Sequence, residues 1–286
     1  MKTDKTIQLD LLHPLKSSLK TKQESESETQ INKIYHLDVF DFLNTKVEDK
    51  SIDLAVVDPP YNMKKARWDT FRSQDDFLHF TFSWIETLIP KLKRSSSLYI
   101  FNTPLNSAYI LQFLVEKKMT FRNWIIWDKQ DGISAAKTKY VSGAETILFF
   151  TQGQHTFNFD AIREPYKSID RMKHAAKKGI LKNGKRWYPN PDGGLCSEIW
   201  RFSSERHKRK VNGKVQKMPH LTPKPMDMLE RIIKASSNEG DLVLDCFMGS
   251  GTTAIASHNL NRNFIGCEKN KEYYDLCSKT LSGCLK

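Results

Sequence analysis

Apolar residues gather in short runs between residues 52 and 151, and segments with helical spacing separate these runs. The runs predict buried strands at four places: 52–57, 97–102, 124–128 and 146–151. Apolar residues recur on one helical face from Phe77 to Leu92, which predicts a helix over 75–93, and 106–117 has the same spacing. Strands that alternate with helices predict an α/β fold with a mostly parallel sheet flanked by helices.

The alternation stops near Gly153 and resumes near residue 220. The segment 154–219 is rich in Lys, Arg, Gly, Pro and Asn, with single aromatic residues among them. Beyond it, the pattern predicts a helix that opens at Pro225 and a last helix from about residue 271. Between these helices it predicts a strand at 242–247, a helix from near Gly251 and a strand at 263–267. We therefore expect a polar mobile tail (1–30), a first block (31–153), an insertion (154–219) and a second block (220–286) of the same domain.

The composition of the chain is typical of a globular protein and limits the kinds of site that it can contain. The chain has 286 residues, 39% of them hydrophobic, so it can bury a core without disulfides or metals. It lacks both a signal peptide and the roughly 18 uninterrupted apolar residues of a membrane span, which predicts a cytoplasmic protein. Five cysteines without a C-x-x-C pair, and no cluster of histidines, predict neither a disulfide nor a metal site.

A glycine turn carries the first candidate chemistry. Residues 242–254 read L-V-L-D-C-F-M-G-S-G-T-T-A, which is a strand, a turn at Gly249 and Gly251, and the start of a helix. Free N–H groups at that helix start suit a bound ligand, and Glu268 at the end of the next strand can accept hydrogen bonds from two ribose hydroxyls. This pattern predicts an adenosine-containing cofactor, although a dinucleotide site or a plain strand-to-helix connection has the same glycines.

The sequence Asp58-Pro59-Pro60-Tyr61 follows the predicted strand at 52–57. An exocyclic amine of a nucleobase is a poor nucleophile, because its lone pair is delocalised into the ring. The Asp58 carboxylate and the Pro59 carbonyl could hold both amine hydrogens and make the nitrogen more tetrahedral, while Tyr61 stacks on the base. The structural alternative is an aspartate that ends a strand and two prolines that stop it.

These motifs and their order resemble S-adenosylmethionine-dependent DNA amino-methyltransferases. From about residue 34 onward the chain is similar to the permuted β group, in which D-P-P-Y precedes the target-recognition region and F-x-G-x-G comes last. Within it, the chain is most similar to adenine-N6 methyltransferases of restriction-modification systems. The resemblance implies a circularly permuted Rossmann-like fold, S-adenosyl-L-methionine as cofactor, and direct methyl transfer to a base flipped out of the duplex. The first block would be catalytic, the insertion would recognise the target and the second block would bind the cofactor.

The resemblance also implies individual cofactor contacts. Lys224, in H-L-T-P-K-P, would pair with the carboxylate of the cofactor, although it could be an ordinary surface lysine. Asp38, in H-L-D-V-F-D-F-L, would meet the adenine ring and could also cap a helix. The expected cofactor-binding residues are Asp38, Thr222, Lys224, Asp245, Phe247, Gly249, Ser250, Gly251, Thr252 and Glu268.

Positive charge is concentrated in the insertion. The chain has 45 Lys and Arg against 33 Asp and Glu, a net charge of +12, and residues 163–217 hold sixteen of the basic and five of the acidic side chains. A charge run is usually a solvated face, but its concentration beside aromatic residues favours DNA contact. The expected DNA-binding residues are Arg186, Arg206, Lys208, Arg209 and Lys210, with Lys64 and Arg67 in a loop after D-P-P-Y that closes over a flipped base or is an ordinary surface loop.

We therefore expect a site-specific methyltransferase that modifies adenine N6 in duplex DNA. Cytosine-N4 methylation is the nearest alternative, and Asp58 argues against it because cytosine enzymes of the family mostly have Ser there. Methylation of an RNA base or of protein glutamine is a further alternative, as is a non-catalytic DNA-binding module with a vestigial pocket. A restriction endonuclease that acts separately and a homodimer are expected from the resemblance.

Overall fold

The computed structural model describes residues 30–129, 137–138, 140–204, 208–211, 214–217 and 223–284. The predicted mobile tail lies outside the described residues except for Gln30, and so do two predicted site residues, Arg206 and Thr222. No helix in the described part of the chain is both long and apolar enough to cross a membrane.

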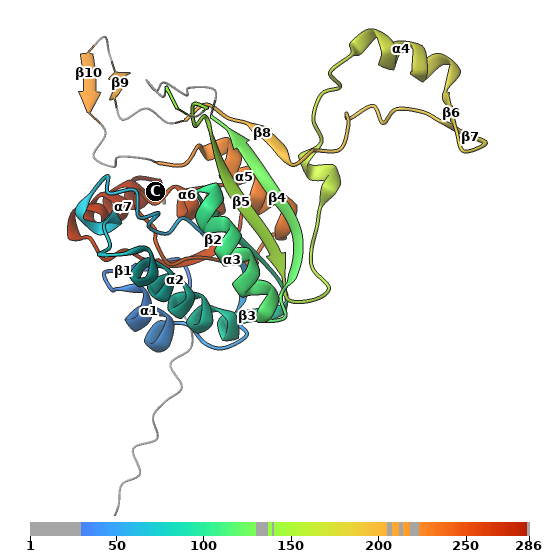
Figure 1. Cartoon of the computed structure of the whole chain (residues 1–286). Coiled ribbons are helices and arrows are strands. Elements are labelled where there is room, and N and C mark those ends of the chain that lie inside the picture. Colours follow the sequence, from blue (N-terminus) through green and yellow to red (C-terminus); the bar gives the residue numbers. More distant parts are fainter. Residues whose placement is uncertain are drawn as a thin grey trace, which may run out of the picture.

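An eight-stranded sheet forms the centre of the protein, in the order β1-β12-β11-β2-β3-β5-β4-β8 (Figure 1). The strands are β1 (Lys33–Tyr35), β2 (Ile52–Val57), β3 (Leu92–Asn102), β4 (Thr120–Asp128), β5 (Ala144–Thr151), β8 (Ile199–Arg201), β11 (Leu242–Asp245) and β12 (Asn263–Cys267). All neighbouring strands are parallel except β5, which runs antiparallel to both β3 and β4. The predicted α/β class with a mostly parallel sheet is confirmed.

Helices cover both faces of the sheet (Figure 1). One face packs against α1 (Val39–Lys46), α2 (Gln74–Leu88) and α3 (Pro104–Glu116), and the other against α5 (Met226–Ser236), α6 (Thr252–Asn259) and α7 (Lys271–Cys284). Side chains of β2 alternate between the two cores: Ala55 and Val57 lie in the first, and Leu54 and Val56 in the second. Burial on both faces explains why β2 reads as a continuous apolar run.

Strands from the two ends of the chain interleave in the sheet. β11 and β12, from the second block, lie between β1 and β2 of the first block, and Leu244 of β11 pairs with Ala55 of β2. Neither block could therefore complete the sheet alone. This arrangement agrees with the circular permutation expected from the order of the motifs.

Several predicted boundaries differ from the structure, and two of them have a clear physical reason. The helix expected over 75–93 ends at Leu88, where Pro90 lies in a 3₁₀ turn, η2 (Ile89–Lys91), and lacks the N–H that a continued helix needs. β3 begins at Leu92 rather than at residue 97. Residues 93–96 are polar, so the pattern of apolar residues did not predict this part of the strand. Leu92 pairs with Ile52 of β2, so pairing rather than side-chain polarity sets that boundary.

The segment 154–219 contributes both to the sheet and to a projection from it. Its elements are η3 (Phe159–Ile162), α4 (Ile169–Lys178), β6 (Ile180–Lys182), β7 (Lys185–Trp187), β8, β9 (Lys208–Val211) and β10 (Lys214–Lys217). β8 pairs with β4 at the edge of the sheet, whereas α4, β6 and β7 form an arm that extends away from the body (Figure 1). The division of the chain into functional blocks stays a prediction.

Candidate active site

A cavity of about 870 Å³ opens where the carboxyl ends of β2, β11 and β12 meet. Ligands of open α/β sheets bind at this edge, and the volume lies in the range of small-molecule sites. The sequence-predicted site residues that line it are Asp38, Asp58, Pro59, Pro60, Tyr61, Arg67, Lys224, Asp245, Phe247, Gly249, Ser250, Thr252 and Glu268. The structure therefore brings both motifs to one cavity, although one lies at residues 58–61 and the other at 242–254.

The glycine turn after β11 has the backbone conformation that the sequence predicted. Gly249 and Gly251 have φ values of 54° and 83°, which favour glycine. A Cβ on Gly251 would collide with the Sγ of Cys277 on α7, so this turn can approach that helix only without a side chain. The turn leads directly into α6, whose first N–H groups face the edge of the sheet where the cavity lies.

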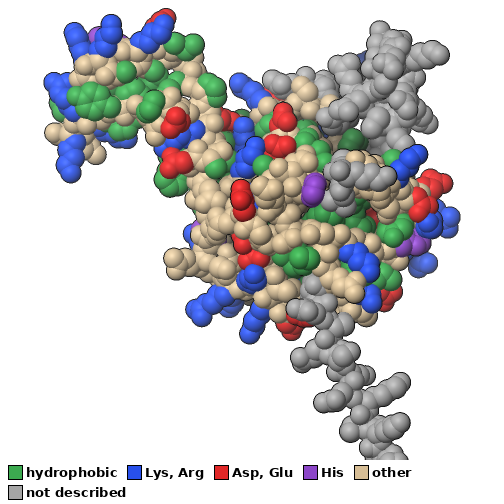
Figure 2. All heavy atoms as spheres, turned by 180° about the vertical axis from the view of Figure 1, so that it is seen from behind, with side chains coloured by type: hydrophobic (Ala, Val, Ile, Leu, Met, Phe, Trp, Pro, Cys, Tyr) green, Lys and Arg blue, Asp and Glu red, His purple; other side chains and the backbone are tan. Residues whose placement is uncertain are grey.

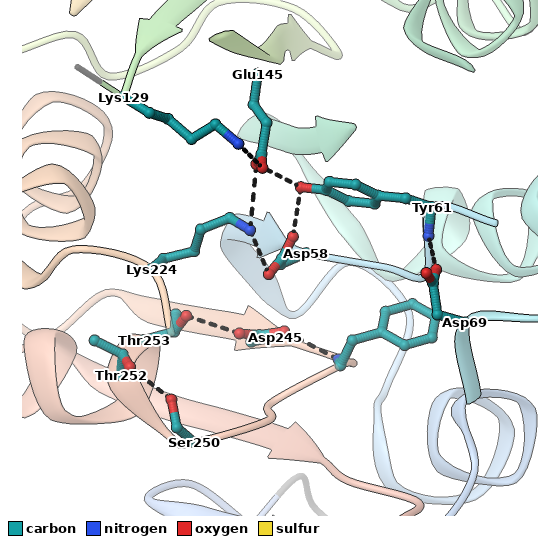
Figure 3. Close-up of polar contacts among 11 residues, drawn as sticks. Asp58, Tyr61, Asp69, Lys129, Glu145, Lys224, Asp245, Ser250, Thr252 and Thr253 are labelled. Atoms are coloured by element: carbon teal, nitrogen blue, oxygen red, sulfur yellow. Dashed lines mark hydrogen bonds and ion pairs between the residues drawn. The ribbon is translucent and has the colours of Figure 1, made fainter. Parts of the chain in front are cut away.

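Asp245, at the end of β11, braces this turn. Its Oδ1 accepts the N–H of Phe247 at 3.0 Å, and its Oδ2 accepts the hydroxyl of Thr253 at 2.7 Å (Figure 3). Burial raises the pKa of Asp245 to about 7, although these hydrogen bonds oppose the shift. A carboxylate buried in this way favours a cationic ligand nearby.

Glu268 and Asp38 complete this side of the cavity. Glu268 follows β12 and accepts the N–H groups of Gly249 and Asn270 at 2.8 and 2.7 Å, one on each oxygen. Each carboxylate oxygen can accept a second hydrogen bond, which leaves capacity for ribose hydroxyls. Asp38 is the N-cap of α1, since its Oδ1 accepts the N–H groups of Phe40 and Asp41. The capping role of Asp38 is confirmed, and its contact with an adenine ring stays a prediction.

Asp58 lies directly after β2, and donors occupy both of its oxygens. The hydroxyl of Tyr61 donates to Oδ1 at 2.8 Å, and Nζ of Lys224 donates to Oδ2 at 2.8 Å (Figure 3). Burial and the negative charge of Asp58 raise the pKa of the Tyr61 hydroxyl well above its usual value, so it remains a donor. Asp58 therefore stays at the cavity as an oriented hydrogen-bond acceptor.

Lys224 is buried, with 9% of its side chain exposed, so the alternative of a surface lysine is wrong. Its ammonium lies 2.8 Å from Oδ2 of Asp58 and 3.6 Å from Oε2 of Glu145. Burial alone would lower the pKa of Lys224, but the two carboxylates raise it above its usual value. The expected pairing of Lys224 with the carboxylate of a cofactor stays a prediction, and in this structure the ammonium is held by protein groups.

Two charged residues of the site escaped the sequence analysis. Glu145 is the second residue of β5, and Lys129 follows the end of β4 and donates to Oε1 of Glu145 at 2.9 Å. Because β5 runs antiparallel to its neighbours, its first residues lie at the same edge as the last residues of β2 and β4. The only indication of Glu145 in the sequence was an acidic residue at the start of an apolar strand. To place it at the site, the direction of that strand had to be known.

The loop after Tyr61 is organised by Asp69, of which 3% is exposed. Its carboxylate accepts the N–H of Tyr61 at 2.6 Å on Oδ1 and that of Met63 at 3.0 Å on Oδ2. Arg67 of this loop lines the cavity, and the side chain of Lys64 is exposed. The loop therefore forms a wall of the cavity, and its closure over a base stays a prediction.

Comparison with known proteins decides the family. A family model described as DNA methylase matches residues 52–279 of this chain. The chain belongs to the DNA methylase family. The Type II methyltransferase M1.MboII of Moraxella bovis is 60% identical over 254 residues, which cover 88% of this chain and 97% of that protein. The DNA adenine methyltransferase YhdJ of Escherichia coli strain K12 is 32% identical, with 82% and 78% of the two chains covered.

Solved structures of other methyltransferases share the fold. The M1.HpyAVI–SAM complex is 27% identical with a TM-score of 0.56, and the match covers 87% of this chain and 98% of that one. The cytosine-N4-specific PvuII methyltransferase has a TM-score of 0.61 at 16% identity and covers 90% and 92%, which shows a common fold alone. The predicted family, enzyme class, fold and cofactor are confirmed: this chain is an S-adenosylmethionine-dependent DNA methyltransferase.

The cavity of this methyltransferase suits the cofactor. The carboxylates of Asp58, Asp245 and Glu268 surround a space open to a cationic sulfonium ligand, and Glu268 has the capacity to bind a ribose. Phe247 adds an apolar wall, and the start of α6 offers backbone N–H groups. When bound, S-adenosylmethionine supplies an electrophilic methyl group.

The described DNA-binding residues predicted within the insertion lie away from the cavity, unlike Arg67. Arg186 is on β7 of the arm, where its guanidinium donates to the carbonyl of Lys178, and Lys208 to Lys210 are on β9. Figure 2 shows Lys and Arg side chains around hydrophobic ones on the projecting arm. The structure does not bring these residues into the cavity, and their contact with DNA stays a prediction.

The raised pKa of Asp245 predicts that the stability of the protein depends on pH. An aspartate has a pKa of about 3.9 when unfolded, so a folded pKa of about 7 means that stability falls as pH rises from about 4 through 7. Between pH 6 and pH 8 the loss is about 1 kcal/mol, or roughly 3 °C in Tm for the cofactor-free protein. We expect Asp245→Asn to remove this part of the pH dependence when thermal unfolding is followed at both pH values.

The matched control is Asp160→Asn, at an exposed position in η3 that pairs with Arg163. This variant should keep the wild-type difference in Tm between pH 6 and pH 8. An equal pH dependence in wild type and Asp245→Asn would contradict the raised pKa of Asp245.

Proposed function

We propose that this methyltransferase transfers a methyl group to N6 of adenine in a short recognition site of duplex DNA. The observation that carries the proposal is the position of Asp58, whose carboxylate is held by Lys224 and Tyr61 at the carboxyl end of β2 and lines the cavity. Pro59, the next residue, has a carbonyl and no N–H, so the backbone there can only accept a hydrogen bond.

Asp58 and the Pro59 carbonyl would together accept both hydrogens of the amine. This geometry makes the amine nitrogen more tetrahedral and frees its lone pair from the ring. S-adenosylmethionine, when bound, would supply the methyl: the N6 lone pair would form the new N–C bond, and the C–S bonding electrons would leave with the sulfur. The amine then holds one proton too many, which Asp58 is placed to take and pass to water. Orientation and electrostatics supply most of the rate enhancement.

The target base must leave the duplex to reach this cavity, because paired DNA buries the amine. Tyr61 offers an aromatic ring beside Asp58, with Nζ of Lys224 5.3 Å from its centroid. A base stacked on this ring would place its amine next to the carboxylate. The apolar and aromatic lining of the cavity supports this role.

Adenine is favoured over cytosine by two observations. Position 58 is Asp, whereas the cytosine-N4 enzymes of the family mostly have Ser there. A relative with 32% identity is named a DNA adenine methyltransferase, while the cytosine-N4-specific PvuII enzyme shares the fold at 16% identity. Cytosine N4 remains the second candidate, since its amine requires the same acceptors.

The biological setting is also a proposal. The relative with 60% identity is named a Type II methyltransferase, which supports a restriction-modification system with a separately acting endonuclease. Duplex DNA is the substrate, and the basic arm and the β9–β10 hairpin are the proposed contacts. A cytoplasmic location and a homodimer stay predictions from the sequence.

Analysis of nucleosides from methylated DNA tests the base and the role of Asp58 together. We expect the wild-type protein to produce N6-methyladenine and Asp58→Ala to lower kcat by at least about 100-fold, because the amine loses its charged acceptor. Cofactor binding, measured by calorimetry, should change little in the variant. Formation of N4-methylcytosine would contradict the adenine assignment, and full activity of Asp58→Ala would contradict the site.

Salt dependence tests the DNA-binding surface. Replacing Lys208, Arg209 and Lys210 by Ala should lower the slope of log K against log salt by up to about 3, since each phosphate contact contributes about 0.9. The control replaces Lys91 and Lys117, which follow α2 and α3 at the opposite edge of the sheet, and should leave the slope unchanged. An unchanged slope in the triple variant would remove β9 from the DNA interface.

A further inference from the structure

Glu145 is a largely buried carboxylate that the reaction described above does not use. Its side chain is 15% exposed and lies between two ammonium groups, with Nζ of Lys129 at 2.9 Å from Oε1 and Nζ of Lys224 at 3.6 Å from Oε2. The hydroxyl of Tyr61 lies 3.2 Å from the same Oε2 (Figure 3). Glu145 thus contacts both residues that hold Asp58, without touching Asp58 itself.

Methyl transfer requires Asp58 to accept a hydrogen bond from the target amine, and the contacts of Asp58 in this structure oppose that. The target amine must donate a hydrogen to Asp58, yet Tyr61 and Lys224 already donate to its two oxygens. The Tyr61 hydroxyl has a single hydrogen and stays protonated, so it can donate fully to one acceptor at a time. Glu145 is a second acceptor within hydrogen-bond distance, 3.2 Å away.

Charge balance gives Glu145 a second effect. The cluster contains two ammonium groups, Lys129 and Lys224, and two carboxylates, Asp58 and Glu145. Lys224 also lies 5.2 Å from the ring centroid of Phe101, in a largely apolar environment. Without the charge of Glu145, Lys224 would be paired with Asp58 alone and would compete more strongly with the amine for that carboxylate.

We propose that Glu145 is a positioning residue for methyl transfer: it shares the ammonium of Lys224 with Asp58, and it accepts the Tyr61 hydroxyl when the target amine takes Oδ1 of Asp58. The inference rests on the proposed role of Asp58 as acceptor of the amine and not on whether the base is adenine or cytosine. Glu145 touches neither substrate nor cofactor in this account.

The variant Glu145→Gln keeps the size and an acceptor oxygen but removes the charge. We expect kcat to fall by about 10-fold to 100-fold, as is typical when the support of a catalytic group is lost, with unchanged cofactor affinity by calorimetry. We also expect the alkaline limb of the kcat–pH profile to move to lower pH. Lys224 then lacks one of the two carboxylates that raise its pKa and loses its proton earlier.

Further variants separate positioning from a structural role. Glu145→Asp restores the charge, so it should recover the alkaline limb and most of kcat even if the Tm of the Gln variant is lower. In a Tyr61→Phe background, which has no hydroxyl to be accepted, Glu145→Gln should cost less than in the wild type. The control Glu86→Gln, at an exposed position on α2 that pairs with Lys117, should resemble the wild type.

Three results would overturn the proposal. These are wild-type kcat and pH profile in Glu145→Gln, failure of Glu145→Asp to restore the alkaline limb, and an equal loss in both Tyr61 backgrounds. If Asp58→Ala is inactive while Glu145→Gln equals the wild type, the role of Glu145 fails and that of Asp58 stands. If Asp58→Ala retains activity, the proposed acceptor fails and the role of Glu145 fails with it.

Discussion

The ion pair between Asp58 and Lys224 joins the two halves of the active site. The two residues are 166 positions apart in the sequence, and their charged groups lie 2.8 Å apart, with 9% of the lysine side chain exposed. Asp58 directly follows β2, in the N-terminal part of the chain, whereas Lys224 precedes α5, in the C-terminal part that carries the glycine turn. The pair therefore forms only when strands from both blocks have assembled into one sheet.

Burying these charges is costly unless each is paired, since desolvation of a single ion costs several kcal/mol. The structure meets this condition with Glu145 and Lys129, which make the cluster neutral, and with aromatic rings that face Lys224. Such fixed charges need little reorganisation during the reaction, which is the usual basis of electrostatic catalysis. Loss of one partner would leave an uncompensated charge in the cavity and affect its neighbours.

Much of the fold was predictable because local patterns determine it. The apolar run of β2, the glycine turn and the helical spacing of α2 each follow from burial or backbone geometry within a few residues. The order of the two motifs also predicted the permutation, since strands after the glycine turn were too few to build a sheet alone.

The remaining features depend on contacts between distant segments. Neither the antiparallel direction of β5 nor the pairing of β8 with β4 has a local signature. The direction of β5 and its pairing with β4 place Glu145 and Lys129 at the site. Burial of Lys224 was missed for the same reason: a lysine beside two prolines looks like a surface residue until its carboxylate partners are known.

The most direct test is a structure of this methyltransferase with duplex DNA and a non-reactive analogue of the cofactor. We expect a flipped adenine whose N6 lies within hydrogen-bond distance of Asp58 and of the Pro59 carbonyl, with the Tyr61 hydroxyl on Glu145. A target amine held by other groups, with Asp58 still bonded to both Tyr61 and Lys224, would contradict it.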